Sequence, residues 1–300
     1  MAQKITPNLW FDGNAKEAVD FYVSALPDSK VLSTEYYPNS AEEGLADFQQ
    51  DMAGKELVIS FDLSGYNFAA INAGPEFKFN QSISFVLNFD PSQDEQAREH
   101  LDELWVKLLD GGEALMPLGA YPFSKRYGWV KDRYGLTWQL ILSDTAGEPR
   151  PFIVPSLMFA GSNVNRAEEA INFYVSLFKD AKPGRLARYG EVTGPAEADS
   201  LAYGDFTLAG QWFAAMDSGV EQATAFNEAV SLAIACKDQA EIDYFWDKLS
   251  VVPEAEQCGW CKDKYGVSWQ IVPENMYELM QRPDAYAHMM AMKKLVIAEF

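Results

Sequence analysis

Few side chains in this sequence are of the types that usually do chemistry in proteins. The 300 residues include two histidines, His100 and His288, and three cysteines, two of which form the C-x-x-C pair Cys258 and Cys261. Imidazole and thiolate are the donors that zinc, iron and nickel prefer, and histidine is the commonest general base. His100 has charged neighbours typical of a helix surface and His288 lies in a Met-rich tail, so we interpret both as ordinary helix residues.

The chain contains the same unit twice, which corrects the C-x-x-C interpretation. Residues 128–141 and 259–272 match at eight of fourteen positions, and three further blocks match upstream in the same order. In this alignment Cys258 and Cys261 correspond to a tyrosine and a valine within a predicted strand, whereas redox cysteines lie at a helix start. We therefore expect both cysteines to pack structurally. The repeat predicts two tandem domains, residues 1–147 and 148–300.

Periodicity predicts an α+β fold, with a βαβββ module occurring twice in each copy. Leu9 and Phe11 alternate with polar neighbours, as in a strand with one buried face, and a helix follows Asn14. The first copy continues with predicted strands at 30–37, 44–51, 56–71 and 82–89, a helix at 93–109, and strands at 126–132 and 136–142.

These motifs together resemble a known family. The blocks N-L-W-F-D-G-N-A, N-x-G-P-E-F-x-F-N and G-W-x-K-D-x-Y-G-x-x-W-Q are similar to the PhnB-like proteins, which carry the label 3-demethylubiquinone-9 3-methyltransferase. They belong to the glyoxalase, bleomycin-resistance and extradiol-dioxygenase superfamily, also called vicinal oxygen chelate. The resemblance implies curved mixed sheets built from paired βαβββ modules, enclosing a cleft where relatives bind a metal and a small substrate. The methyltransferase label lacks support, because no strand leads through a glycine-rich turn into a helix.

Strand parity tests whether the implied metal ligands are present. Successive side chains of a strand face opposite ways, so the ligand positions lie opposite the helix-packed Leu9, Phe11, Ile83, Phe85, Trp138 and Leu140. These positions are Asn8, Ser82 and Gln139 in the first copy, and Ser156, Ala229 and Gln270 in the second. None is a histidine, so we predict no transition metal and no cofactor.

Two carboxylates distinguish the second copy. Asp217 and Glu228 replace Asn72 and Gln81 of the first copy, and carboxylates can carry a proton whereas amides cannot. They are the candidate catalytic residues, and burial would raise their pKa. Alternatively, they would hold a hard cation together with Gln270, or they are solvated surface groups.

The predicted cleft also presents small and polar side chains that would bind a ligand. Ser84 and Val86 face the cleft in the first copy, and small residues occupy the matching strand of the second. Either this leaves volume for a small molecule or facing aromatic residues fill it. The candidate ligand-binding residues are Asn8, Trp10, Asn72, Phe79, Asn80, Ser82, Gln139, Ser156, Phe226, Asn227 and Gln270.

Composition limits the partners. The formal net charge of −20 disfavours nucleic acid and anionic membranes, and three cysteines without a secretory signal indicate the cytoplasm. The Met-rich tail after Glu274 would cover an apolar surface of this chain or of a second copy, as in a homodimer. We interpret the protein as a small-molecule-binding member of the superfamily. The alternatives are a metal-dependent glyoxalase-like lyase, isomerase or dioxygenase, a bleomycin-resistance-like sequestering protein, and a chain with one purely structural copy.

Overall fold

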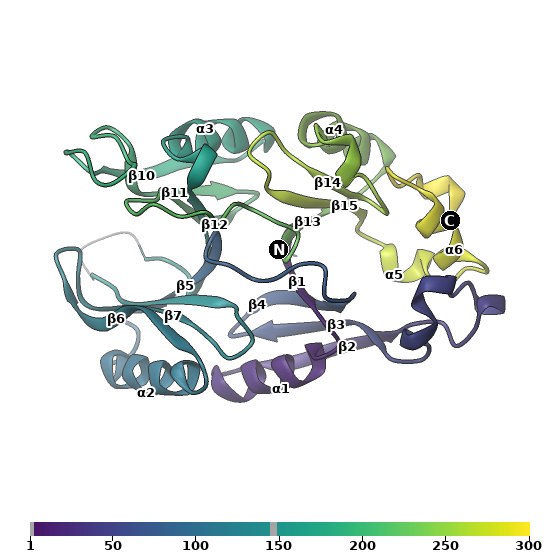
Figure 1. Ribbon diagram of the computed structural model, residues 1–300, viewed down its shortest axis with the longest axis horizontal. Coiled ribbons are helices and arrows are strands. Elements are labelled where there is room, and N and C mark those ends of the chain that lie inside the picture. Colours follow the sequence, from purple (N-terminus) through teal and green to yellow (C-terminus); the bar gives the residue numbers. More distant parts are fainter. Residues whose placement is uncertain (1–2, 145–148) are drawn as a thin grey trace. The chain divides into compact units, whose positions relative to one another are not determined.

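The computed structural model describes residues 3–144 and 149–300 (Figure 1). The described residues form an α+β structure, as the periodicity predicts, with two mixed sheets of seven and eight strands. No helix among the described residues is both long and apolar enough to span a bilayer.

The chain folds into two compact units that do not follow the two sequence copies. The first unit comprises residues 1–24, 28–77 and 226–300, and the second comprises residues 25–27 and 78–225. Each unit therefore combines one module from each copy. The division at residue 147 describes the sequence repeat, and its use as a domain boundary stays a prediction.

The first unit contains the seven-stranded sheet. Its strand order is β14 (Trp260–Lys262), β15 (Ser268–Pro273), β13 (Val230–Cys236), β1 (Ile5–Phe11), β4 (Tyr66–Asn72), β3 (Glu56–Leu63) and β2 (Lys30–Tyr36). Its helices are α1 (Ala15–Ala25), α4 (Gln239–Leu249), α5 (Met276–Leu279) and α6 (Ala285–Ala291), with 3-10 turns η1 (Ala41–Glu43), η2 (Asp47–Met52), η4 (Pro253–Ala255) and η5 (Ile297–Glu299).

The second unit contains the eight-stranded sheet. Its strand order is β10 (Lys182–Arg188), β11 (Leu201–Leu208), β12 (Gln211–Asp217), β9 (Ile153–Phe159), β5 (Ile83–Phe89), β8 (Thr137–Leu142), β7 (Ser124–Lys131) and β6 (Glu113–Tyr121). Its helices are α2 (Ala97–Leu109) and α3 (Ala167–Leu177), with the 3-10 turn η3 (Gly161–Asn163).

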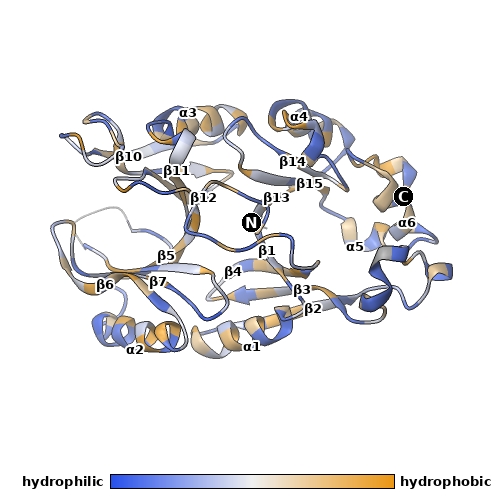
Figure 2. Cartoon of the chain, in the orientation of Figure 1, coloured by the Kyte–Doolittle hydropathy of each residue, from blue (hydrophilic) through white to orange (hydrophobic). Residues whose placement is uncertain are grey.

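An antiparallel pair of strands from opposite copies joins the two halves of each sheet. In the first unit β1 pairs with β13, and in the second unit β5 pairs with β9. Helices α2, α3 and α4 pack against strands of their own sheets, and Figure 2 shows both hydrophobic and hydrophilic residues on α2 and α3. On α2 the buried residues Leu101, Leu104 and Leu108 recur at helical spacing.

Two predicted elements differ from the structure, and one strand was not predicted. Residues 44–51 form no strand, because most of this segment lies in the 3-10 turn η2, and residues 56–71 form two strands joined by a turn at Ser64 and Gly65. The predictions also missed β6, whose irregular pairing with β7 includes several register shifts. The last module, which contains β13, β14 and β15, has the 3-10 turn η4 among its described residues at the position that β6 takes in the module of β5, β7 and β8. The first residue of η4, Pro253, lacks the N–H that a strand ladder needs.

The Met-rich tail packs within the first unit. Leu279, Met292 and Leu295 are buried in one apolar cluster, and Tyr286 packs with Tyr37 in a second. The tail therefore covers an apolar surface of its own chain, one of the two predicted alternatives. A homodimer stays a prediction.

Candidate functional site

Glycines next to helices reveal which face of the second sheet lies away from them. A Cβ atom added at Gly128 would meet the ring of Trp105 in α2, and one added at Gly204 would meet Ile171 in α3. Because side chains alternate along a strand, Tyr127 and Trp129 point away from the helices. We call this the helix-free face of the second sheet.

Strand register assigns further residues to this face. Gln139 lies opposite Trp129 and Val86, and Ser156 lies opposite Ser84 and Ala214. Parity along the first copy predicted that Ser84, Val86 and Gln139 share a face, and the register confirms it.

A chain of hydrogen bonds crosses the helix-free face. The Tyr127 hydroxyl donates to Gln139 Oε1 at 2.8 Å, and Gln139 Nε2 donates to Ser84 Oγ at 2.8 Å. Burial raises the pKa of Tyr127 far above its ordinary value, so its hydroxyl stays protonated and able to donate. These bonds fix the Gln139 amide.

Three buried polar atoms on the same face have no hydrogen-bond partner among the described residues. They are the indole nitrogen of Trp129 and the hydroxyls of Ser82 and Ser156, and these residues are 8%, 1% and 0% exposed. Unsatisfied buried polar atoms are rare in native proteins. By contrast, Trp138 in the neighbouring strand donates its indole N–H to Asp132 Oδ2 at 2.8 Å. These unsatisfied atoms therefore require an explanation.

The surroundings of Trp129 are apolar and adaptable. Tyr127, Trp129 and Met158 form a buried cluster, against which Leu115, Met116, Tyr121, Ile141 and Met216 pack. Methionine side chains change shape easily and make favourable contacts with aromatic rings. This composition suits contact with an organic molecule.

A buried ion pair lies further along this face. Asp205, opposite Ala214 in the register, accepts hydrogen bonds at its Oδ2 from Arg150 Nε at 3.1 Å and Nη2 at 2.9 Å. The Arg150 guanidinium also stacks 3.8 Å from the ring centre of Trp212. The aspartate charge is thus balanced by its partner.

The first unit arranges the equivalent face differently. Asn8 lies opposite Ser231 and Ala69, and the Gln270 amide donates to Ser231 Oγ at 2.9 Å. The indole of Trp10 donates to the Gly74 carbonyl at 2.7 Å.

Aromatic rings pack together in this first unit. The Trp10 ring makes edge contacts with Phe77 at 4.9 Å and with Trp260 at 5.9 Å between centroids. The Trp10 indole therefore has both a hydrogen-bond acceptor and ring contacts, and Trp10 lacks the unsatisfied donor that Trp129 carries. Ser268 of this unit also carries a buried hydroxyl without a partner among the described residues. Its register partner in β14, Lys262, forms an ion pair with Glu228.

The structure regroups the residues that sequence analysis assigned by copy. Asn8, Ala229 and Gln270 belong to the first unit, whereas Ser82, Gln139 and Ser156 belong to the second. The grouping by copy was wrong because each sheet takes its strands from both copies.

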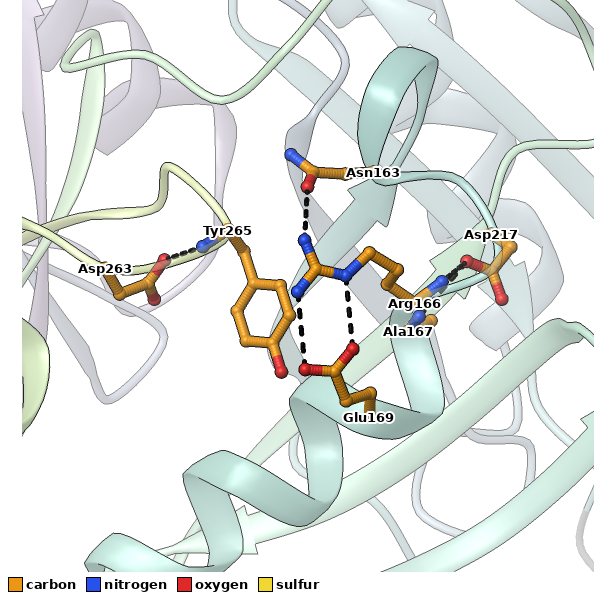
Figure 3. A network of polar contacts seen from close by, with 7 residues as sticks. All are labelled: Asn163, Arg166, Ala167, Glu169, Asp217, Asp263 and Tyr265. Atoms are coloured by element: carbon orange, nitrogen blue, oxygen red, sulfur yellow. Dashed lines mark hydrogen bonds and ion pairs between the residues drawn. The ribbon is translucent and has the colours of Figure 1, made fainter. Parts of the chain in front are cut away.

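Asp217 supports the start of helix α3 (Figure 3). Its Oδ1 accepts hydrogen bonds from the backbone N–H groups of Arg166 and Ala167 at 3.0 and 3.1 Å, and Oδ2 accepts from Leu201 N at 3.0 Å. Burial raises the pKa of this carboxyl, whereas the backbone donors act to lower it. Its side chain lies on the face of β12 that packs against α3, whereas the side chain of Ala214 lies on the helix-free face. Its assignment as a catalytic residue stays a prediction that this placement does not support.

Asn72 has the same role in the first unit. Its Oδ1 accepts from the N–H of Ala15 at the start of α1, at 3.0 Å, and its Nδ2 donates to the Glu56 carbonyl at 3.0 Å.

Glu228, the second catalytic candidate, forms an ion pair with Lys262 at 2.7 Å, with side-chain exposures of 18% and 21%.

The remaining candidates shape the loops before two strands. Asn80 Oδ1 accepts from Ser82 N at 2.8 Å, and Asn227 Oδ1 accepts from Ala229 N at 3.0 Å, both local turns that asparagine favours. Phe226 is buried, and Phe79 lies within 4 Å of where a side chain at Gly135 would begin.

The donors on these faces do not fit the metal that the superfamily implies. Among the described residues, no three His, Cys, Asp or Glu side chains gather where they could hold an ion. His100 instead lies 2.6 Å from exposed Asp94. The hard-cation hypothesis with Asp217, Glu228 and Gln270 also loses its ligands, since Asp217 bonds to backbone and Glu228 to Lys262.

The cysteines also lack a reactive setting. Cys261 is buried in β14, where burial raises the pKa of its thiol, and Cys258 lies 3.6 Å from the sulfur of Met290. Both raised thiol pKa values oppose nucleophilic chemistry.

Comparison with known proteins agrees with this fold. The family model for 3-demethylubiquinone-9 3-methyltransferase matches residues 3–141 and, a second time, residues 151–272. The chain belongs to this family. The PhnB protein from Bacillus cereus is 34% identical over 47% of this chain and 100% of that chain, with a TM-score of 0.40.

Glyoxalase I from Zea mays is 12% identical, covering 91% of this chain and 95% of that chain, with a TM-score of 0.52. This family member therefore has the tandem glyoxalase-like fold. No relative among curated proteins matches the chain.

Tyr127 and Trp129 are candidate site residues of this PhnB-like protein that do not appear among the candidates predicted from the sequence. Strand alternation was the available signal, because Tyr127 and Trp129 flank Gly128 in β7. Their side chains therefore point to the face of the sheet away from α2, against which Gly128 lies.

Proposed function

We propose that this protein binds a small organic molecule at the helix-free face of the second sheet, without a transition metal. The observation that carries the proposal is the set of unsatisfied polar groups on that face, which includes the Trp129 indole N–H and the Ser156 hydroxyl. A buried donor without a partner costs about 1–3 kcal/mol, and a ligand that supplies a partner recovers that cost on binding.

The rest of the face supports the same role. The Tyr127, Gln139 and Ser84 hydrogen bonds hold the amide in place, and the methionine and aromatic side chains near Trp129 offer apolar contact. Small-molecule sites are typically apolar, with a few fixed polar groups. In this proposal the first unit, where Trp10, Phe77 and Trp260 pack together, serves a structural role.

The proposal includes the cellular setting. We place the protein in the cytoplasm, because all three cysteines are free thiols and such thiols persist in reducing compartments. Homodimer formation and catalytic turnover are separate predictions and are not required for binding.

A ligand screen tests the proposal. Thermal unfolding is measured with a panel of neutral, anionic and cationic small organic compounds and divalent metal ions. A compound at a hundredfold excess over its Kd stabilises the protein by about 2.7 kcal/mol.

Each compound that stabilises the protein is measured again with two variants. Ser156→Ala should lose much of the effect, whereas Ser268→Ala, which removes an unsatisfied hydroxyl in the first unit, should retain it. Equal stabilisation of both variants, or stoichiometric zinc, nickel or iron in the purified protein, would contradict the proposal.

A further inference from the structure

The chemistry around Trp129 limits the class of ligand. The apolar side chains packed with it are aromatic, aliphatic and thioether groups. Burying a charged group against such side chains is costly, and the net charge of −20 repels anions. A neutral molecule is favoured.

The unsatisfied indole specifies the polar group of that molecule. Tryptophan Nε1–H is a donor only, so the ligand must present an acceptor. The neighbouring Gln139 amide is already held at both ends, because its oxygen accepts from Tyr127 and its nitrogen donates to Ser84.

Aromatic residues in the cluster favour a flat molecule. The Tyr121 and Tyr127 rings make an edge contact at 5.5 Å, and Phe123 makes another with Tyr127 at 4.9 Å. Such rings extend edge and stacked contacts to further aromatic groups. Met116, Met158 and Met216 can adapt to the molecule's outline.

We propose that the ligand is a neutral aromatic carbonyl compound whose carbonyl oxygen accepts the hydrogen bond of the Trp129 indole. This inference rests on the proposed function and narrows its ligand class. The Ser156 hydroxyl, which can donate or accept, is a further unsatisfied polar group on the same face.

The test compares two compounds of the same shape. The first is 1-acetylnaphthalene, and the second is 1-isopropenylnaphthalene, in which a CH₂ group replaces the carbonyl oxygen. Their dissociation constants are measured by titration calorimetry with the wild-type protein and with Trp129→Phe. Trp10→Phe is the matched control, because its indole already donates to a backbone carbonyl in the first unit.

The wild type should bind the ketone about tenfold more tightly than the alkene, which corresponds to about 1.4 kcal/mol. Trp129→Phe should abolish this preference with little change for the alkene, and Trp10→Phe should retain it. If Trp129→Phe does not fold, the infrared carbonyl stretch of ¹³C-labelled ketone bound to the wild type replaces it, with a shift to lower wavenumber expected.

Other outcomes separate the two proposals. Equal binding of ketone and alkene, weakened alike by Ser156→Ala, would overturn the carbonyl inference and leave the site standing. A ketone preference that survives in Trp129→Phe would also overturn it. Absence of binding by both compounds would reject this ligand class, and the compound screen then decides the proposed function separately.

Discussion

The carboxylate of Asp132 accepts a hydrogen bond from the indole nitrogen of Trp138 at 2.8 Å. Asp132 Oδ1 also accepts from the backbone N–H groups of Tyr134 and Leu136, so one buried carboxylate fixes both the turn and the following strand. Asp263 and Trp269 repeat this relationship, also at 2.8 Å. The D-x-x-G motif shared by the two copies is therefore a structural device.

Replacing this aspartate should destabilise the fold strongly. Asp132→Ala leaves one indole and two backbone donors without an acceptor, so we expect a loss of about 3 kcal/mol in the free energy of unfolding. Urea denaturation measures it, with Asp20→Ala as the control, because Asp20 forms only an exposed ion pair with Lys16. A loss below that of the control would contradict the assigned role.

Removing the Ser156 hydroxyl should stabilise the ligand-free protein while weakening binding. Ser156→Ala eliminates a buried polar group without a partner, and we expect a gain of about 1 kcal/mol in the free energy of unfolding. Ser268→Ala should give a similar gain without affecting the ligand. The account fails if Ser156→Ala destabilises the free protein, since the hydroxyl would then already have a partner.

Asp217 and Asn72 should not tolerate exchange of their side chains. Asp217→Asn turns an amide NH₂ toward the donors that now bond to the carboxylate, and should cost about 1–3 kcal/mol. Asn72→Asp sets a carboxylate oxygen against the Glu56 carbonyl and should also destabilise. Chemical denaturation of both variants checks this, and unchanged stability in either would contradict the capping role.

The pH dependence of stability should change in the Asp217→Asn variant. Burial raises the pKa of this carboxyl above 3.8, so the folded state binds the proton more strongly than the unfolded state does. The stability that this group contributes is then complete at pH values below 3.8 and is lost as the pH rises through the raised pKa. The wild-type free energy of unfolding minus that of the variant should therefore fall with rising pH across the acid range. A constant or rising difference would refute it.

The tail should contribute to the stability of the first unit. Leu295 is fully buried among tail residues and Val272 of β15, so Leu295→Ala should cost about 2–5 kcal/mol. Tyr277→Ala is the matched control within the tail, because Tyr277 is 63% exposed. Similar effects of the two substitutions on the melting temperature would show that the tail does not dock as described.

Local patterns predicted much of this structure, but not its long-range pairing. The parity of Gln139, Val86 and Ser84 placed them correctly on one face, because alternation is a local property of a strand. The pairing of Asn8 with Ser231 joins distant parts of the sequence, and no periodicity within one copy encodes it. The candidates were grouped by copy for this reason.

The same alternation could have placed Asp217. Phe213 and Ala215 share its face of β12, whereas Trp212, Ala214 and Met216 point the other way. Asp217 was predicted to be catalytic because it is a carboxylate, although alternation along its strand places it on the face that packs against the helix. The unsatisfied state of Trp129 was beyond sequence analysis, because it depends on which atoms surround the indole in three dimensions.

The central claim is that the Trp129 indole lacks a partner until a ligand supplies one. ¹⁵N–¹H correlation spectra of protein labelled at tryptophan indoles, titrated with 1-acetylnaphthalene, test this most directly, with Trp129→Phe providing the assignment. We predict a downfield shift of the Trp129 signal, while the Trp138 and Trp269 signals, already bonded to aspartates, stay in place. A static Trp129 signal together with a shift of Trp10 or Trp260 would place binding in the first unit and contradict the account.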